Sequence, residues 1–277
     1  MPTAYEVVTE SIIKQLESGV APWRKPWRTE MPANLVSKKE YRGINVFLLA
    51  SQGYGSRYWL TFRQAQALGG SVSKGEHGSK VVFWKIGEYQ KEDKETGETE
   101  NRKSILLRYF TVFTLEQCEG IKSPEPTRVI APLEQCETIV HSMPNPPSFE
   151  QDSRACYRPF SDTVGMPARS AFDSAEEFYS TFFHELTHST GHPSRIGREG
   201  IERLNTFGSE SYSKEELIAE MGAAMLAGVA GIERKTLGNS AAYLKSWIDV
   251  LKSDARMVVF AASQAQKAAD YIQGGAR

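Results

Sequence analysis

The segment with the most specific chemistry is His184-Glu185-Leu186-Thr187-His188. Residues four apart share one face of an α-helix, so His184 and His188 can direct ring nitrogens at a single ion. In H-E-x-x-H hydrolases, two imidazoles hold Zn²⁺, which lowers the pKa of a water molecule toward ~7. Glu185 lies beside them as the general base that takes a proton from this water. The segment therefore predicts a zinc-dependent hydrolase site, and another divalent metal is an alternative to zinc. The non-functional explanation is that the two histidines are ordinary surface or core residues.

A catalytic zinc site needs a third protein ligand and one open position. One candidate for this ligand is His192, although the metzincin pattern H-E-x-x-H-x-x-G-x-x-H would put its histidine where Ser194 stands. Glu216 and Glu220 are four residues apart in a predicted helix and face one side of it. We expect Glu216 to bind the metal and Glu220 to hydrogen-bond a ligand histidine, an arrangement like that of gluzincins, with exchanged roles as an alternative. The other explanation of these two glutamates is that they lie on an ordinary solvent-exposed acidic face near the start of the helix.

The neighbouring residues predict how the motif is positioned. Ser174 and Glu177 have the spacing of a capping box, which starts a helix, and Gly191 and Pro193 end it. Residues 162–168 are expected to form a short edge strand beside this helix, and such an edge can pair with an extended peptide.

Three further side chains are candidates for supporting a transition state. They are Tyr157, Tyr212 and Arg195. Their spacing gives no order of preference among them.

The N-terminal part of the chain combines positive charge with aromatic residues. Residues 21–85 contain 11 basic and 3 acidic residues within a chain whose net charge is −1. Surfaces that bind single-stranded nucleic acid stack bases on rings at ~1–3 kcal/mol each, while cations follow the phosphates. The candidate DNA-binding residues are Trp23, Arg24, Lys25, Trp27, Arg28, Arg42, Asn45, Trp59, Arg63, Lys74, Lys80 and Trp84. The alternative is that most of these rings form a core and the cations an ordinary solvated face.

Apolar periodicity and turn residues predict the remaining elements. The expected helices span residues 5–18, 41–50, 59–68, 133–142, 213–230 and about 237–272. Residues 71–86 are expected to form a hairpin that turns between Gly75 and Gly78, and a strand is expected at 104–114 after an exposed charged excursion at 90–103.

Prolines concentrated between residues 119 and 150 indicate a boundary between two domains. We expect an α+β protein with a small mixed α/β domain at 1–122, a proline-rich linker at 123–150 and a mainly helical domain with a short sheet at 151–277.

Bulk composition narrows the class of protein. Hydrophobic content of 40% and charged content of 24% are typical of globular chains, and no apolar run is long enough to cross a bilayer. The N-terminus lacks the basic start and apolar stretch of a signal peptide. Three cysteines without metal-type pairing are typical of reduced thiols. The sequence therefore predicts a cytoplasmic protein without a membrane partner.

Several segments together resemble the ArdC-type antirestriction proteins of conjugative plasmids, whose N-terminal domain is shared with TraC-type plasmid primases. The matching stretches are GVAPWRKPWR, YRGINVFLL, W-x-T-F-x-Q-A, GGSVSKGEHGSKVVFWK, RYFTVFTLEQCEGI, FHELTHSTGHPSR, YSKEELIAEMGAA and the C-terminal YLKSWIDVLKSDARMVVFAASQAQKAADYI. The resemblance covers nearly the whole chain.

This resemblance implies a domain that binds single-stranded DNA without sequence specificity, followed by a zincin-like metallopeptidase domain. The implied role is protection of incoming plasmid DNA from host restriction, with a host restriction factor as a candidate protein substrate. A DNA-coating shield with a structural metal is the alternative. A primase-related enzyme is disfavoured because no clustered Asp-x-Asp motif is present.

Overall fold

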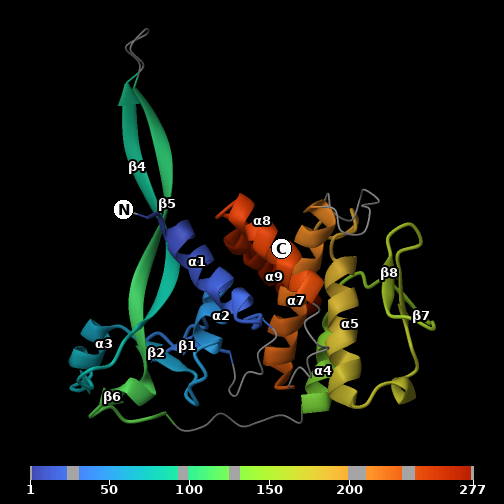
Figure 1. Ribbon diagram of the computed structural model, residues 1–277, viewed down its shortest axis with the longest axis horizontal. Coiled ribbons are helices and arrows are strands. Elements are labelled where there is room, and N and C mark those ends of the chain that lie inside the picture. The colour runs from blue at the N-terminus through green and yellow to red at the C-terminus, as the bar shows by residue number, and fades with distance from the viewer. Residues whose placement is uncertain are drawn as a thin grey trace.

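The computed structural model describes residues 2–23, 31–92, 99–124, 132–198, 210–232 and 241–275. A mixed α/β region with a curled sheet is followed by a mostly helical region with a short sheet, as Figure 1 shows. The predicted α+β class is therefore confirmed.

The N-terminal region is built around a four-stranded sheet in the order β1-β2-β5-β4. Its strands are β1 (Ala33–Asn34), β2 (Tyr58–Leu60), β4 (Ser79–Glu92) and β5 (Thr99–Thr114). β1 and β2 are parallel, while β5 is antiparallel to both β2 and β4. The β4–β5 pair continues well past the other strands as a long two-stranded ribbon (Figure 1).

Short helices and a second small sheet complete this region. They are α1 (Ala4–Glu17), α2 (Ile44–Ala50), α3 (Phe62–Ala67), the 3₁₀ turn η1 (Leu115–Gln117), and the paired strands β3 (Ser71–Val72) and β6 (Cys118–Glu119). α1 starts with a capping box in which Thr3 and Glu6 bond each other's backbone amides, so this helix is defined by its own sequence.

The structure differs from the prediction at three places in this region. Residues 71–86 do not form a hairpin, because β3 pairs with β6 and β4 pairs with β5 instead. Residues 59–68 begin as strand β2 and become helical only at Phe62, where Thr61 provides the N-cap. The charged stretch 90–103 belongs in large part to β4 and β5, with residues 93–98 outside the described part of the chain.

The C-terminal region consists mainly of packed helices. They are α4 (Pro132–Ser142), α5 (Ala175–Ser189), α7 (Glu210–Ala230), α8 (Ala241–Ser253) and α9 (Met257–Ile272), with the 3₁₀ turn η2 (Arg169–Ala171) before α5. The single helix expected at 237–272 is two helices, since the chain breaks at Asp254–Arg256. α7 packs between α5 and α9 and is buried on nearly every side from Leu217 to Ala227.

A three-stranded sheet lies on the outer side of α5 (Figure 1). It consists of β7 (Ser148–Gln151), β8 (Cys156–Arg158) and β9 (Thr163–Met166) in the order β7-β9-β8. The strand predicted at 162–168 is therefore the central one and not an edge, because both of its sides are already paired. Among the strands that the structure describes, the unpaired edges of this sheet belong to β7 and β8.

One hydrophobic core joins side chains from both regions. Val8, Ile12 and Leu16 of α1 and Phe47 of α2 share this core with α5, α7, α8 and α9. Trp23 lies inside it, with its ring 5.4 Å from that of Trp247 in an edge-to-face arrangement. The segment that follows α1 therefore packs against the C-terminal helices.

Replacing Trp23 is expected to destabilise the whole protein. Trp23 is 0% exposed, so Trp23→Ala leaves a cavity and should lower the free energy of unfolding by about 3–5 kcal/mol. Trp84 is 52% exposed, so Trp84→Ala should cost less than about 1 kcal/mol. Urea denaturation followed by circular dichroism compares the two variants. Equal stability of the two would contradict the shared core.

Candidate metal centre

The metal motif lies on α5, and the local sequence explains why this helix forms and where it packs. The Ser174 hydroxyl accepts a hydrogen bond from the Glu177 amide at 3.2 Å, which caps the helix start. The Glu177 carboxylate bonds the Asp173 amide and not that of Ser174, so only half of the predicted capping box is present. Phe183 and Leu186 are fully buried in the shared core and fix the rotation of the helix.

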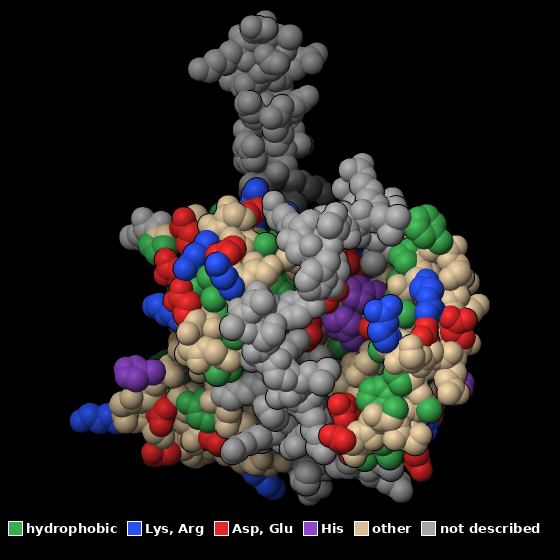
Figure 2. Space-filling model, turned by 45° about the vertical axis from the view of Figure 1, so that its right-hand side comes forward, with side chains coloured by type: hydrophobic (Ala, Val, Ile, Leu, Met, Phe, Trp, Pro, Cys, Tyr) green, Lys and Arg blue, Asp and Glu red, His purple; other side chains and the backbone are tan. Residues whose placement is uncertain are grey.

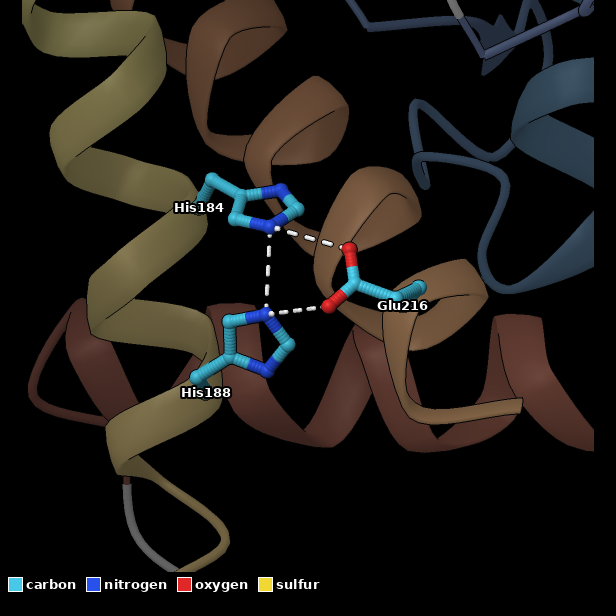
Figure 3. A group of neighbouring side chains, drawn as sticks. All are labelled: His184, His188 and Glu216. Carbon is cyan, nitrogen blue, oxygen red and sulfur yellow. Dashed lines mark hydrogen bonds and ion pairs between the residues drawn. The ribbon is translucent and has the colours of Figure 1, made fainter. Parts of the chain in front are cut away.

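Two histidines of α5 and one glutamate of α7 converge on a single point (Figure 3). The Nε2 atoms of His184 and His188 are 3.1 Å apart. The Glu216 carboxylate lies 3.6 Å from His184 Nε2 and 3.4 Å from His188 Nε2. Ligands ~2.0–2.1 Å from a tetrahedral ion are about 3.3 Å from one another, so these three donors fit one cation with a position left for solvent.

The histidines are reached from the surface. Figure 2 shows histidine side chains gathered on this face of the molecule, with acidic side chains beside them. His184 and Glu216 keep 17% and 14% of their side chains exposed, so a ligand from solvent can reach the donor atoms.

A second glutamate, Glu215, supports His188 from its other edge. Its carboxylate lies 3.3 Å from His188 Nδ1, so the two consecutive glutamates of α7 face opposite edges of one imidazole ring. Arg198 holds Glu215 through two hydrogen bonds of 3.0 and 2.6 Å and also donates to the Thr187 carbonyl at 2.8 Å. This buried arrangement holds Nδ1 of His188 and leaves its Nε2 directed at the other donors, where a metal would bind.

The charges of these groups depend on one another. Burial disfavours a charged ring, but the hydrogen bonds of Glu215 and Glu216 outweigh it and raise the pKa of His188 to about 10. Burial would raise the pKa of Glu216, yet its bonds to His184 and His188 hold that pKa well below the usual range. Without metal, His188 therefore keeps a proton that a bound cation must displace.

The sequence assigned the supporting role to Glu220; the structure shows such a contact for Glu215, and the role of Glu220 stays a prediction. Glu220 is buried on α7, but it is not among the three residues whose donor atoms converge. Sequence spacing favoured Glu220 because residues four apart share a helix face. The contact of Glu215 depends on Arg198, which lies 17 residues earlier and carries no local signal.

Glu185 is the residue of the motif that stays out of the donor group. It is only 9% exposed, and no hydrogen bond from another described residue holds its carboxylate. Its charge acts on Cys156 of β8 and on His188, which places it between the metal site and the small sheet.

The other candidates for catalytic support have structural contacts. The Tyr157 hydroxyl donates to Asp162 at 2.9 Å, and Arg195 pairs with the same carboxylate at 2.6 Å. Arg195 also bonds the Ser189 carbonyl at the end of α5. The His192 ring bonds Ser194, and the side chain of Tyr212 lies outside the described residues.

A glycine sets how closely α5 and α7 approach. A Cβ atom at Gly222 would lie 2.5 Å from Thr187 Cγ2 and 2.7 Å from its Oγ1. Thr187 lies between the two ligand histidines, and Glu216 lies less than two turns before Gly222. Any larger residue at 222 would therefore separate the helices that carry the donor atoms.

The predicted DNA surface is only partly exposed. Trp23 and Trp59 are buried in separate cores. The Asn45 amide is buried too and makes two hydrogen bonds of 2.7 Å with the Val82 backbone. The prediction that these three residues bind DNA is therefore corrected, because buried side chains cannot contact DNA.

The other predicted DNA-binding residues divide into two groups. Those with exposed side chains are Arg42, Arg63, Lys74, Lys80 and Trp84. Those outside the described residues are Arg24, Lys25, Trp27 and Arg28.

The helix with two histidines and the glutamate of a second helix define a zincin-like site, and comparisons with known proteins agree. Residues 134–264 match the family model described as a zincin-like metallopeptidase, and residues 2–113 match the N-terminal domain of the anti-restriction factor ArdC. The chain belongs to the ArdC family of antirestriction proteins. The domain limits at 122 and 151 themselves stay a prediction.

Solved structures of ArdC from plasmid R388 are similar over nearly the full length. The metal-free one is 40% identical, with a TM-score of 0.77, and the match covers 98% of this chain and 96% of that one. The Mn(II)-bound one is 38% identical, with a TM-score of 0.76, and the match covers 98% and 97%. The metal-binding capacity of this fold is thus documented in a relative.

Curated relatives extend the comparison. A DNA primase TraC of Escherichia coli is 36% identical over 97% of this chain, which spans about a quarter (27%) of that protein. An uncharacterized protein of Sinorhizobium fredii is 34% identical, with 97% of this chain and 91% of that protein covered. Among the described helices, none has the length and apolar character that crossing a bilayer requires.

Removing the charge of Glu215 is expected to weaken metal binding. Glu215→Gln keeps the size of the side chain but loses the charge facing His188, so metal affinity should fall about 10–100-fold. Glu220→Gln removes the charge of the glutamate that the sequence predicts in this role, so the two variants show which glutamate supports the ligand histidines. Isothermal titration calorimetry with Zn²⁺ and Mn²⁺ measures both. Unchanged affinity in Glu215→Gln would contradict its supporting role.

Proposed function

We propose that this chain is a zinc-dependent peptidase that also binds single-stranded DNA without sequence specificity. The observation that carries the peptidase proposal is the convergence of His184, His188 and Glu216 beside Glu185. Membership of the ArdC family supports a role in protecting incoming plasmid DNA from host restriction. A protein bound to that DNA, such as a host restriction factor, is the proposed substrate.

The proposed ligands are His184, His188 and Glu216, whose nitrogen and carboxylate donors suit Zn²⁺. A bound divalent cation supplies a polarised carbonyl and a more acidic water molecule. Glu185 takes the proton of the attacking water and passes it to the leaving amine. Its burial and its lack of a hydrogen bond to another described residue leave the carboxylate available for this transfer.

The proposed position of the peptide is the free edge of β8. Among the described strands, β8 pairs with β9 alone. The charge of Glu185 acts on Cys156 of β8, so this strand lies near the general base. An extended peptide that adds to this edge makes main-chain hydrogen bonds, so it can be held with little dependence on its sequence. The strand-addition proposal thus moves from β9 to β8.

The DNA-binding proposal rests on charge and exposed rings in the N-terminal region. Arg42, Arg63, Lys74 and Lys80 are exposed cations in a stretch with few acids. Such a surface binds phosphates with strong salt dependence and little base preference.

The decisive experiment is Glu185→Gln. The substitution removes the general base but none of the proposed metal ligands. Cleavage of a casein substrate by zinc-loaded protein should fall about 10²–10⁴-fold while zinc content stays at one ion per chain. Zinc is quantified by mass spectrometry on the same samples.

Antirestriction in cells then separates the peptidase from a DNA-coating shield. If Glu185→Gln protects incoming plasmid DNA as well as the unmodified chain does, proteolysis is not required and the shield is the better description. Cleavage unaffected by the substitution would remove Glu185 from the mechanism altogether.

A further inference from the structure

A cavity of about 630 Å³ lies where the two regions of the chain meet. Its walls come from β4, from the segment that leads into α2, and from α9. This volume is typical of sites for small organic ligands and fits a nucleotide unit. The cavity is separate from the metal ligands, none of which lines it.

Two exposed aromatic rings line this cavity. Phe83 and Trp84 are 47% and 52% exposed, so a ligand in the cavity can reach both rings. The Phe83 ring is 5.8 Å from that of Phe110 on the paired strand, and Phe110 is itself 47% exposed. Phe83 and Phe110 therefore share one face of the β4–β5 ribbon, while Trp84, the next residue of β4, points to the opposite face.

The ribbon face that carries Phe83 and Phe110 is positively charged. Phe83 is paired with Arg108, so both side chains point to the same side of the sheet. The described positions on this face from Ser79 to Lys85 and from Leu106 to Val112 include Lys85 and Arg108 but no carboxylate. Rings alternating with cations favour a polyanion with flat bases.

Inside the cavity, the acidic groups are already neutralised. Asp270 is paired with Arg42, and Glu40 is paired with Arg57 at 2.8 Å. The ammonium groups of Lys39 and Lys267 are exposed and have no ion pair or hydrogen bond within the described part of the chain. Lys39 and Lys267 therefore give the cavity positive charge that its own acidic groups do not neutralise.

The wall formed by α9 is tied to the N-terminal region. The Gln266 side-chain oxygen accepts a hydrogen bond of 3.0 Å from the Gly43 amide, and its amide group donates to Asp270 at 3.0 Å. These bonds hold Lys267 beside the start of α2.

We infer that single-stranded DNA occupies this cavity and the adjoining face of the ribbon, with Lys267 of α9 contacting a phosphate. The inference rests on the proposed DNA-binding function and adds that both regions of the chain contribute to the DNA site. The last helix of the metallopeptidase region supplies part of a surface that the sequence assigned to the N-terminal region alone. Bases stack on Phe83 and Trp84, and Lys39 and Lys267 face the backbone.

The test is fluorescence anisotropy of a labelled oligothymidylate with the full chain, measured across a series of salt concentrations. Lys267→Ala should weaken binding several-fold and reduce the slope of log affinity against log salt by about 0.7, the value for one phosphate contact on a single strand. Trp84→Ala should weaken binding about fivefold or more through lost stacking. Lys245→Ala, an exposed lysine of α8 outside the cavity, is the matched control and should bind as the unmodified chain does.

The outcomes separate this inference from the proposed function. If the unmodified chain binds no oligonucleotide, the DNA-binding function itself fails. If it binds and both Lys267→Ala and Trp84→Ala bind equally well, DNA binding stands and the shared site is overturned. A loss with Lys245→Ala as large as with Lys267→Ala would mean a general effect of charge and would overturn the site as well. Zinc content of each variant shows that the fold is intact.

Discussion

The packing of α7 against α5 is the interaction on which the rest of the molecule depends. Neither helix can form the metal site alone, because α5 provides two imidazoles and α7 provides the carboxylate. α7 is apolar around most of its circumference, so it is held by α5 on one side and α9 on the other. At the start of α7, Glu215 and Glu216 bring charge into this packed interface and face the two edges of His188.

Features encoded in short stretches of sequence could be predicted, and features created by tertiary contacts could not. The spacing of His184 and His188 is a helical property, so it placed both rings correctly. Glu216 was a preferred candidate for the same reason. The supporting role of Glu215 was missed, since it requires Arg198 from a separate segment. Likewise, the strand at 163–166 was predicted, but its central place depends on β7 and β8 arriving from both sides.

The aromatic residues also show that sequence alone does not reveal tertiary contacts. Composition could not distinguish rings that stack on a ligand from rings that fill a core, and both kinds occur within residues 21–85. Trp23 and Trp59 are interior, while Phe83 and Trp84 are exposed. Alternation along β4 does not decide this either, because Val81 and Phe83 share a face and only Val81 is covered by neighbouring elements. The long reach of the ribbon beyond the sheet leaves its rings in solvent.

The close contact of Gly222 with Thr187 makes side-chain volume in the core a constraint on the metal site. Neither residue is one of the three donors, yet together they set how far apart the donors lie. A bulkier residue at this point would move the donors beyond the separation of about 3.3 Å that ligands ~2.0–2.1 Å from one tetrahedral Zn²⁺ ion require. The fit of the site to a small cation therefore depends on a position in the core, even when every donor residue is left in place.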